Sequence, residues 1–210
     1  MANDNMIKIT WLGHSCFKVE SQGYAVVIDP YEDGYVPGLA PLRETANHVL
    51  CSHKHGDHNY RSAISVNEKA PSPFRITALP TYHDDRKGEL RGSNTIHVLD
   101  NGSLRVAHFG DLGCDLSGEQ AALLTRLDAV MIPVGGYYTI DAGQAKALVD
   151  RIQPKVVIPM HYRGETFGFD VLSTIDAFTD LCDVVVEYPG SFLELAEDTE
   201  PHTAILKLNG

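Results

Sequence analysis

His53-Lys54-His55-Gly56-Asp57-His58 places three imidazoles and one carboxylate within six consecutive positions. Neutral imidazole and carboxylate groups are the ligands that zinc and similar divalent ions bind in proteins. Only Lys54 and Gly56 separate the four groups, and few other functions need so many of them in so short a stretch. The segment therefore predicts a metal site, and we interpret the chain as a metalloenzyme.

The short apolar run Val49-Leu50-Cys51 precedes this segment and predicts a buried strand, so the segment is the loop that leaves the strand's end. Three other apolar runs lead in the same way to possible ligands: 76–79 before His83, 104–107 before His108 and Asp111, and 156–160 before His161. A lone histidine after a strand is more often a surface or hydrogen-bonded residue. Four strand ends that each carry such groups instead favour one shared site.

The number of candidate ligands distinguishes one ion from two. The candidates are His53, His55, Asp57, His58, His83, Asp111 and His161. They are too many for one tetrahedral ion, but they suit two ions that share a bridging carboxylate. Such ions, about 3.5–4 Å apart, can hold a bridging hydroxide because coordination lowers the pKa of water to about 7. We predict two divalent ions, with zinc expected and manganese, nickel or iron also compatible, and a hydroxide nucleophile.

The rest of the sequence predicts an α/β domain that begins with an antiparallel meander. Residues 7–11 and 16–20 alternate between apolar and polar side chains, and the apolar run 24–28 follows a turn. The later apolar runs, at 49–51, 76–79, 104–107, 129–132 and 156–158, fit strands that are covered on both faces. Further strands are expected at 184–187, 192–195 and 204–207.

Two helices are expected after capping boxes, because Ser117 is followed by Gln120 and Asp141 by Gln144, each before an apolar pattern of helical period. A weaker helix is expected at about 172–181. No shift in composition marks a linker, so residues 1–210 are predicted to form a single domain of packed sheets with helices outside.

Composition limits the possible partners. A formal net charge of −11 without a Lys/Arg run argues against nucleic acid, and no apolar run reaches the roughly 18–20 residues of a membrane span. The polar segment Met1–Asn5 does not resemble a secretory signal, so a cytoplasmic protein with a small-molecule substrate is expected. The scattered cysteines, Cys16, Cys51, Cys114 and Cys182, predict free thiols. The sequence neither favours nor excludes a homo-oligomer.

The segment 53–58 matches HxHxDH, the signature of the metallo-β-lactamase superfamily, and the whole chain resembles this family. The family's other motifs follow in order, with Asp29 closing an early strand, His83 in Thr81-Tyr82-His83, Asp111 in Phe109-Gly110-Asp111 and His161 in Pro159-Met160-His161-Tyr162. The resemblance implies a four-layer αββα sandwich of two mixed sheets with helices on the outer faces.

The resemblance also implies how the ligands divide. His53, His55 and His83 would hold the first ion, Asp57, His58 and His161 the second, and Asp111 would bridge them. Asp29 would lie behind the ligands and orient their loop. His55 occupies the position at which the flavo-diiron oxidoreductases of the superfamily carry Glu, which favours a hydrolytic centre.

Four stretches narrow the resemblance to a branch of the superfamily. They are Trp11-Leu12-Gly13-His14, Arg91-Gly92-Ser93-Asn94, Val134-Gly135-Gly136 and Ile158-Pro159-Met160-His161-Tyr162. They most resemble the small bacterial metal-dependent hydrolases, a branch that includes ascorbate-6-phosphate lactonase. The chain has no insertion that could build the clamp domain of the nucleic-acid-processing branch.

Other residues near the motifs have two interpretations each. His108 either donates a proton to the leaving group or is a hydrogen-bonded residue behind the ligands, and Asp57 can steer the hydroxide or relay a proton. His14 is expected to hydrogen-bond to the ligands. Tyr138 and Tyr162 either line the substrate pocket or pack in the core. His48, His97 and His202 are expected at the surface.

Three functions remain after these observations. The preferred one is a hydrolase whose metal-bridging hydroxide attacks an ester, lactone, amide or phosphodiester of a small molecule. The first alternative is a mononuclear iron-dependent oxidoreductase similar to the sulfur dioxygenases of the superfamily. The second is a metal-binding protein without catalysis, which the open coordination positions of the predicted site argue against.

Overall fold

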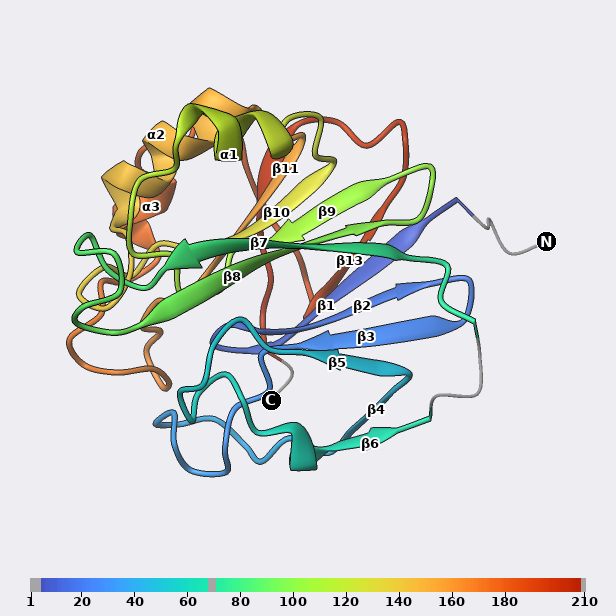
Figure 1. The fold of residues 1–210 in the computed structure, drawn as a ribbon, viewed down its shortest axis with the longest axis horizontal. Coiled ribbons are helices and arrows are strands. Elements are labelled where there is room, and N and C mark those ends of the chain that lie inside the picture. The colour runs from blue at the N-terminus through green and yellow to red at the C-terminus, as the bar shows by residue number, and fades with distance from the viewer. Residues whose placement is uncertain (1–4, 68–70, 209–210) are drawn as a thin grey trace.

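Two stacked β-sheets form the centre of the computed structural model, which describes residues 5–67 and 71–208 (Figure 1). Residues 1–4 of the polar N-terminal segment considered above lie outside the described residues. No helix in the described ranges is long and apolar enough to cross a membrane.

The smaller sheet has five strands in the order β13-β1-β2-β3-β5. Its strands are β1 (Ile7–Gly13), β2 (Cys16–Ser21), β3 (Tyr24–Ile28), β5 (His48–Leu50) and β13 (Phe192–Leu195). The first three form the predicted antiparallel meander, in which Val19 lies opposite Ile9 on one side and Val26 on the other. β5 then pairs in parallel with β3. Side chains alternate along β1 as predicted, so that Ile7, Ile9 and Trp11 are buried.

The larger sheet has seven strands in the order β12-β14-β11-β10-β9-β8-β7. Its strands are β7 (Arg75–Tyr82), β8 (Ser93–Asp100), β9 (Arg105–His108), β10 (Ala129–Pro133), β11 (Val156–Met160), β12 (Val185–Glu187) and β14 (His202–Ile205). β9, β10 and β11 run parallel, and every residue of β10 and β11 is buried, as their apolar sequences predict.

Two predictions about this sheet are wrong. Residues 76–79 are not covered on both faces, because β7 is an edge strand in which Thr77 and Ala78 are exposed. β8 was not predicted, because its polar first residues, 93–95, hide the apolar pattern that follows.

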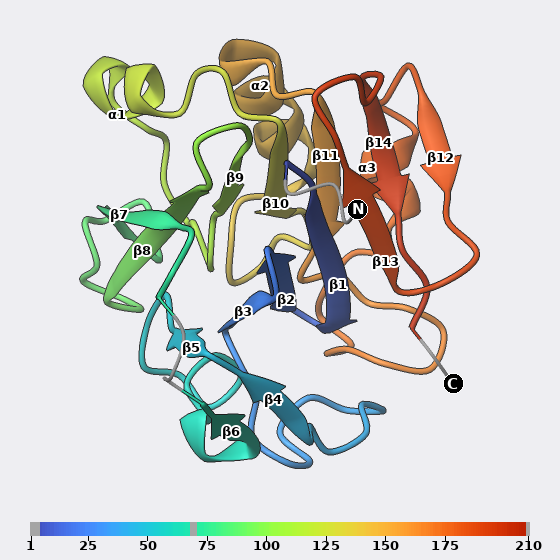
Figure 2. The ribbon, with the colours of Figure 1, turned by 90° about the vertical axis from the view of Figure 1, so that its right-hand side faces the viewer.

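Helices cover the outer face of the larger sheet (Figures 1 and 2). They are α1 (Gly118–Leu123), α2 (Ala142–Ile152) and α3 (Asp176–Thr179), and both predicted capping boxes are present at the first two. α2 packs on β10 and buries Ala145, Leu148 and Ile152. The third helix is shorter than the predicted 172–181, because Thr174 forms a β-bridge with Arg163, whose N–H donates to the carbonyl of Ser173.

The outer face of the smaller sheet is covered differently from the expectation, since no α-helix of the described residues lies on it. Instead, residues 31–43, the strand pair β4 (Glu44–Ala46) and β6 (Ile64–Val66), and the 3-10 helix η1 (Arg61–Ala63) pack there. Figure 1 shows β4 and β6 on the side of the molecule away from the helices. This layer buries Val36, Leu42 and Ile64 against Cys16 and Val27 of the sheet. The predicted class, a mixed αβ sandwich of two sheets, is confirmed.

Strand direction brings six strand ends to one edge of the sandwich. β1 and β3 are both antiparallel to β2, and β5 is parallel to β3, so these three strands point the same way. β7 and β9 are both antiparallel to β8, β10 is parallel to β9, and β11 is parallel to β10, so β7, β9 and β11 also share one direction. The residues that follow these ends are His14, Asp29, the segment 51–58, His83, the segment 109–111 and His161. The topology therefore assembles residues that are far apart in the sequence.

Candidate metal centre

Asp29 fastens the HxHxDH loop to the end of β3. Its Oδ1 accepts the backbone N–H of Ser52 at 2.6 Å, and its Oδ2 accepts the Ser52 hydroxyl at 2.6 Å and His58 Nδ1 at 2.8 Å. Burial alone would raise the pKa of Asp29, but the adjacent His58 and His108 outweigh it, and the pKa is about 2. Because an ionised Asp29 accepts a hydrogen bond from Nδ1–H of His58, His58 Nε2 is left to face the site. The hydrogen bond between Asp29 and His58 fits the predicted role of Asp29, which is to orient the loop that carries the ligands.

The first group of candidate ligands consists of His53, His55 and His83, whose ligand atoms lie within 4.8 Å of one another. His53 Nε2 lies 3.0 Å from His55 Nδ1, and the rings of His53 and His83 are 4.7 Å apart. His53 and His83 are buried, whereas His55 is exposed at the mouth of the site. The structure thus brings together the three residues that the resemblance assigns to one ion.

The second group consists of Asp57, His58 and His161, again within 4.8 Å, and His14 joins it. Asp57 Oδ2 lies 3.6 Å from His58 Nε2 and 3.4 Å from His14 Nε2. The rings of His14 and His161 are 4.2 Å apart. His14 therefore lies among the candidate ligands of the second group, at a position from which it can contact Asp57 or an ion directly.

Asp111 lies between the two groups. Its Oδ2 is 3.1 Å from His83 Nε2 and 3.3 Å from His161 Nε2, and its Oδ1 is 3.2 Å from His58 Nε2. Gly110 makes this position possible, because it has a φ of 54° and a Cβ there would lie 2.3 Å from Asn94 Oδ1. One carboxylate thus touches histidines of both groups, as a bridging ligand must.

Unsatisfied polar atoms show that these residues fit metal ions. His58 Nε2, His161 Nε2 and Asp111 Oδ1 are buried and, among the described residues, form no hydrogen bond, although the Asp111 carboxylate lies 3.2 Å and 3.3 Å from the two histidines. Buried polar atoms nearly always form a hydrogen bond. Three neighbouring buried atoms without one therefore need an explanation. The donor set of five histidines and two aspartates is one that divalent ions of the zinc type accept. Two such ions would satisfy these atoms.

The protonation states of His53 and Asp111 also suit metal binding. Burial, together with the neighbouring His58, lowers the pKa of His53 to about 3, so its imidazole is neutral. Burial alone would raise the pKa of Asp111, but His161 and His58 outweigh it and hold that pKa well below its usual value. Neutral imidazoles and ionised carboxylates are the forms that bind a cation without first losing a proton. Burial alone would lower the pKa of His58, but Asp111, Asp57 and Asp29 outweigh it and raise that pKa, so His58 would have to lose a proton to bind an ion.

Three residues of the site have a strained backbone conformation. His14, Asp29 and His161 have φ angles of 50°, 53° and 54°, in the left-handed region that residues other than glycine seldom occupy. Such conformations cost of order 1–3 kcal/mol each and persist where the surrounding structure fixes them, often at functional sites. Nothing in the sequence signalled this strain.

His108 lies behind the centre, and a role as proton donor to a leaving group does not fit this position. It is fully buried, its Nε2 donates to the carbonyl of Ser15 at 2.8 Å, and its Nδ1 accepts the N–H of Gly110 at 3.1 Å. With both ring nitrogens engaged, it supports the loop that carries Asp111. The sequence had left both interpretations open, and the geometry favours the hydrogen-bonded one.

A cavity of about 370 Å³ opens onto the two groups. It is lined by Tyr35, His55, Asp57, His83, Arg91, Asp111, Tyr138, His161 and Phe169. Of the two tyrosines predicted to line a pocket, Tyr138 does so. Tyr162 does not, because it is buried against Trp11, with ring centroids 5.7 Å apart. Tyr35, Arg91 and Phe169 were not predicted, since loops bring them to the cavity.

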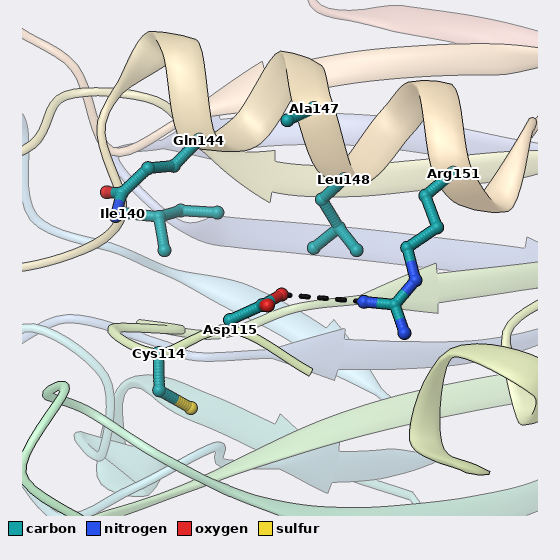
Figure 3. Close-up of a pocket in the computed structure, with 7 residues that line it drawn as sticks. All are labelled: Cys114, Asp115, Ile140, Gln144, Ala147, Leu148 and Arg151. Atoms are coloured by element: carbon teal, nitrogen blue, oxygen red, sulfur yellow. Dashed lines mark hydrogen bonds and ion pairs between the residues drawn. The ribbon is translucent and has the colours of Figure 1, made fainter. Parts of the chain in front are cut away.

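Another cavity, of about 380 Å³, lies between α2 and residues 114–115 (Figure 3). Arg151 of α2 points into it towards Asp115, at 3.5 Å, and Cys114 lies on its wall. Burial raises the pKa of the Cys114 thiol, which disfavours a reactive thiolate there. Within the described ranges, none of the candidate metal groups includes a residue of this cavity, so we assign the chemistry to the first cavity.

Of the three histidines expected at the surface, His97 contradicts the prediction. It is buried on β8, and its Nε2 lies 3.2 Å from the carbonyl of Cys51, just before the HxHxDH loop. His48 is exposed and His202 is half-buried. The error at His97 follows from the strand that was not predicted, because without β8 there was no face on which to bury it.

Asp84 organises the loop that follows His83. Its two carboxylate oxygens accept the backbone N–H groups of Arg86, Gly88, Leu90 and Arg91 at 2.7–3.0 Å. Burial alone would raise its pKa, but these four bonds, that to Arg91 first, outweigh burial and hold the pKa at about 2. One side chain thus shapes residues 84–91 and sets the position of Arg91 in the cavity.

Replacing Asp84 by asparagine is expected to loosen this loop, because an amide has one acceptor oxygen and its NH₂ group would face backbone donors. Hydrogen–deuterium exchange of residues 86–91 should become faster, and Asp85→Asn, at an exposed position in the same loop, should leave it unchanged. Equal exchange in the Asp84 variant and the unaltered chain would show that the four bonds do not hold the loop.

The fold and this site define a class of protein. Residues 8–161 match the family model described as the beta-lactamase superfamily domain, and the chain belongs to that superfamily. The predicted family is therefore confirmed.

Individual relatives of the chain carry more specific descriptions than the family model does. A metal-dependent hydrolase of Carboxydothermus hydrogenoformans is 28% identical over 191 residues, which cover 74% of this chain and 84% of that protein. Another of the same description, from Archaeoglobus fulgidus, is 29% identical over 195 residues, with coverages of 74% and 83%.

Solved structures show the same fold. A Thermotoga maritima protein, described as a Zn-dependent hydrolase of the metallo-beta-lactamase superfamily, superposes with a TM-score of 0.75 and 30% identity, covering 97% of this chain and 100% of that one. The metallo hydrolase Igni18 of Ignicoccus hospitalis has a TM-score of 0.65 at 22% identity, covering 90% of this chain and 98% of that one. At this identity, the second similarity concerns the fold alone.

Proposed function

We propose that the chain is a hydrolase of small molecules that works with two divalent metal ions. His53, His55 and His83 would hold one ion, Asp57, His58 and His161 the other, and Asp111 would bridge them. The position of Asp111 is the observation that carries the proposal, because its carboxylate lies 3.1 Å from a histidine of one group and 3.3 Å from a histidine of the other.

The class of reaction rests on the relatives. They are named metal-dependent hydrolases, in agreement with the prediction from sequence, and they support neither an iron-dependent oxidoreductase nor a protein without catalysis. The cavity of about 370 Å³ falls in the usual range for small-molecule sites, which supports a small substrate. A cytoplasmic location and the absence of nucleic-acid partners stay predictions of the sequence.

When bound, two such ions supply a hydroxide at neutral pH and electrophilic stabilisation of the oxygen that gains charge. Asp57 lines the cavity and is the group placed to accept a proton from the attacking water. Burial alone would raise its pKa, but His58 outweighs burial and keeps Asp57 ionised. His14 is buried beside it with a pKa lowered to about 4, chiefly by burial and by His161, so it is neutral near pH 7.

Zinc is the ion we expect, since histidine-rich sites with carboxylates suit it, and manganese, nickel or iron can occupy the same ligands. The proposal is tested by screening esters, lactones, amides and phosphodiesters with metal-free protein to which zinc, manganese or iron is added, while oxygen is monitored. Hydrolysis that depends on added metal, without oxygen uptake, is the expected result. Oxygen consumption with iron alone, and no hydrolysis with any metal, would refute the proposal.

His14 provides a test of the second ion. Replacing it by alanine removes a buried imidazole 3.4 Å from Asp57, so the ion of that group should bind about 10–100-fold more weakly, the usual effect of losing a supporting residue. The first ion should be retained. Elemental analysis after dialysis against graded concentrations of a chelator measures both. His48→Ala, at an exposed position, is the matched control, and equal retention of both ions in His14→Ala would contradict the assignment.

A further inference from the structure

Among the described residues that line the cavity at the candidate metal centre, Arg91 is the one permanently charged cation. It is half-buried, and its Nη2 donates to the carbonyl of Tyr137 at 3.2 Å. Its guanidinium carbon lies 5.7 Å from the ring centroid of Tyr138, which is a cation–π distance. Its backbone N–H is held by Asp84. The side chain is therefore positioned by three separate contacts at the wall of the cavity.

The charges of the site leave Arg91 without a counterion in the cavity. If two divalent ions are bound as proposed above, their four positive charges are offset by Asp29, Asp57, Asp111 and one hydroxide. Within residues 5–67 and 71–208, no further carboxylate lines the cavity. In a chain of net charge −11, an uncompensated arginine at this place is a local reversal of sign. The electrostatics therefore favour a ligand that brings its own negative charge.

The remaining walls of the cavity suit the carbon skeleton of such a ligand. Tyr35, Tyr138 and Phe169 present aromatic rings, and the rings of Tyr35 and Tyr138 lie 6.3 Å and 6.1 Å from that of Phe169. The cavity thus offers metal ligands, an aromatic wall and a guanidinium group. Since the contact with Tyr137 uses one of the five guanidinium N–H donors, others are left for a carboxylate or phosphate.

On the basis of the proposed hydrolase function, we propose that the substrate carries an anionic group, carboxylate or phosphate, besides the bond that is cleaved, and that Arg91 binds this group. Arg91 is then a specificity-determining residue that selects anionic over neutral substrates. Its action is on binding and orientation, and the bond that breaks lies at the metal centre.

Binding of matched acids tests this proposal without turnover. Pentanoate has one carboxylate, for the metals, whereas glutarate and 4-phosphonobutyrate have the same carbon spacer and a second anionic group. Calorimetry with zinc-loaded protein should give at least about tenfold tighter binding of a dianionic acid than of pentanoate. The ratio should fall to about one in Arg91→Gln and lie between these values in Arg91→Lys. Arg86→Gln, exposed in the same loop and outside the cavity lining, should keep the ratio of the unaltered chain.

The two dianionic acids also distinguish a phosphate from a carboxylate on the substrate. If 4-phosphonobutyrate gains more affinity over pentanoate than glutarate does, the substrate carries a phosphate. If glutarate gains more, the substrate carries a carboxylate. A ratio near one for both acids in the unaltered chain, or a ratio that Arg91→Gln leaves unchanged, would overturn the proposal. Thermal melting of each variant establishes that it is folded.

Esters of the same acids separate the two proposals. Zinc-loaded protein should hydrolyse mono-4-nitrophenyl glutarate with a higher kcat/KM than 4-nitrophenyl pentanoate, and the ratio should fall in Arg91→Gln. Equal hydrolysis of both esters would remove the role of Arg91 and leave the hydrolase. If neither ester is cleaved, the outcome counts against the hydrolase proposal, and the calorimetric ratio still decides whether Arg91 binds an anion.

Discussion

Replacing Asp111 by alanine is expected to lower turnover by about 10³-fold or more, whatever the substrate. The carboxylate contacts histidines of both ligand groups, so its loss removes the group that would hold the two ions together. Loss of a single stabilising donor costs about 10²–10³-fold in other enzymes. Loss of a shared ligand should cost at least as much, because it weakens both ions and their spacing.

The fold should survive this substitution. Asp111 lies in the loop after β9 and contributes no side chain to the apolar core between the sheets. Circular dichroism and thermal melting of the metal-free proteins establish this point. Asp115→Ala, at an exposed position in the same loop, is the control and should keep its activity. Turnover of the Asp111 variant at the level of the unaltered chain would remove the bridging role.

Removing the metal ions is expected to cause the largest change in stability. Ions that bind only the folded chain stabilise it by about 4 kcal/mol each when the free metal is about 1,000 times its Kd. For a chain of this size, each kcal/mol shifts Tm by roughly 2–4 °C. The melting temperature should therefore fall by at least about 10 °C when both ions are removed.

The positions of the candidate ligands give a reason for so large a fall in melting temperature. The candidate ligands come from loops after β5, β7, β9 and β11, which belong to both sheets, so the ions would join the two halves of the sandwich. Calorimetric melting of zinc-loaded protein and of protein treated with a chelator measures the difference. Asp111→Ala should show a smaller difference than the unaltered chain. Identical melting temperatures with and without metal would mean that no ion is bound at this site in the folded state.

The candidate ligands could be predicted from the sequence because four of them lie within six consecutive positions and the others follow apolar runs. Segment 53–58 needs no tertiary information, and strands β9 and β11 are marked by buried runs that end near Asp111 and His161. The parallel direction of neighbouring strands then brings these ends together. This part of the site follows from local sequence and topology.

The cavity walls could not be predicted in the same way. Tyr35 and Phe169 come from irregular segments whose course is set by tertiary hydrogen bonds, such as the bond from the Gly168 N–H to the carbonyl of Pro37. Tyr162, for which the sequence left both pocket lining and core packing open, is part of the core, and His161 just before it adopts a left-handed conformation. Such a conformation carries no sequence signal in a residue other than glycine.

The layers of the fold were predicted only in part. Periodicity identified the meander and capping boxes marked both longer helices, since these signals are local. The cover of the smaller sheet was expected to be helical, but it is built from residues 31–43 and short strands that bury isolated apolar side chains. Such a layer has no period that a sequence pattern can reveal.

A metal titration examines whether the seven candidate ligands hold two ions that act together. Metal-free protein is titrated with zinc while hydrolysis of a substrate found in the screen is recorded, and bound zinc is measured in parallel. If the two ions act together, activity should rise until two equivalents are bound, and Asp111→Ala should not reach this state. Full activity at one equivalent, with no further zinc bound, would contradict the proposal of two ions.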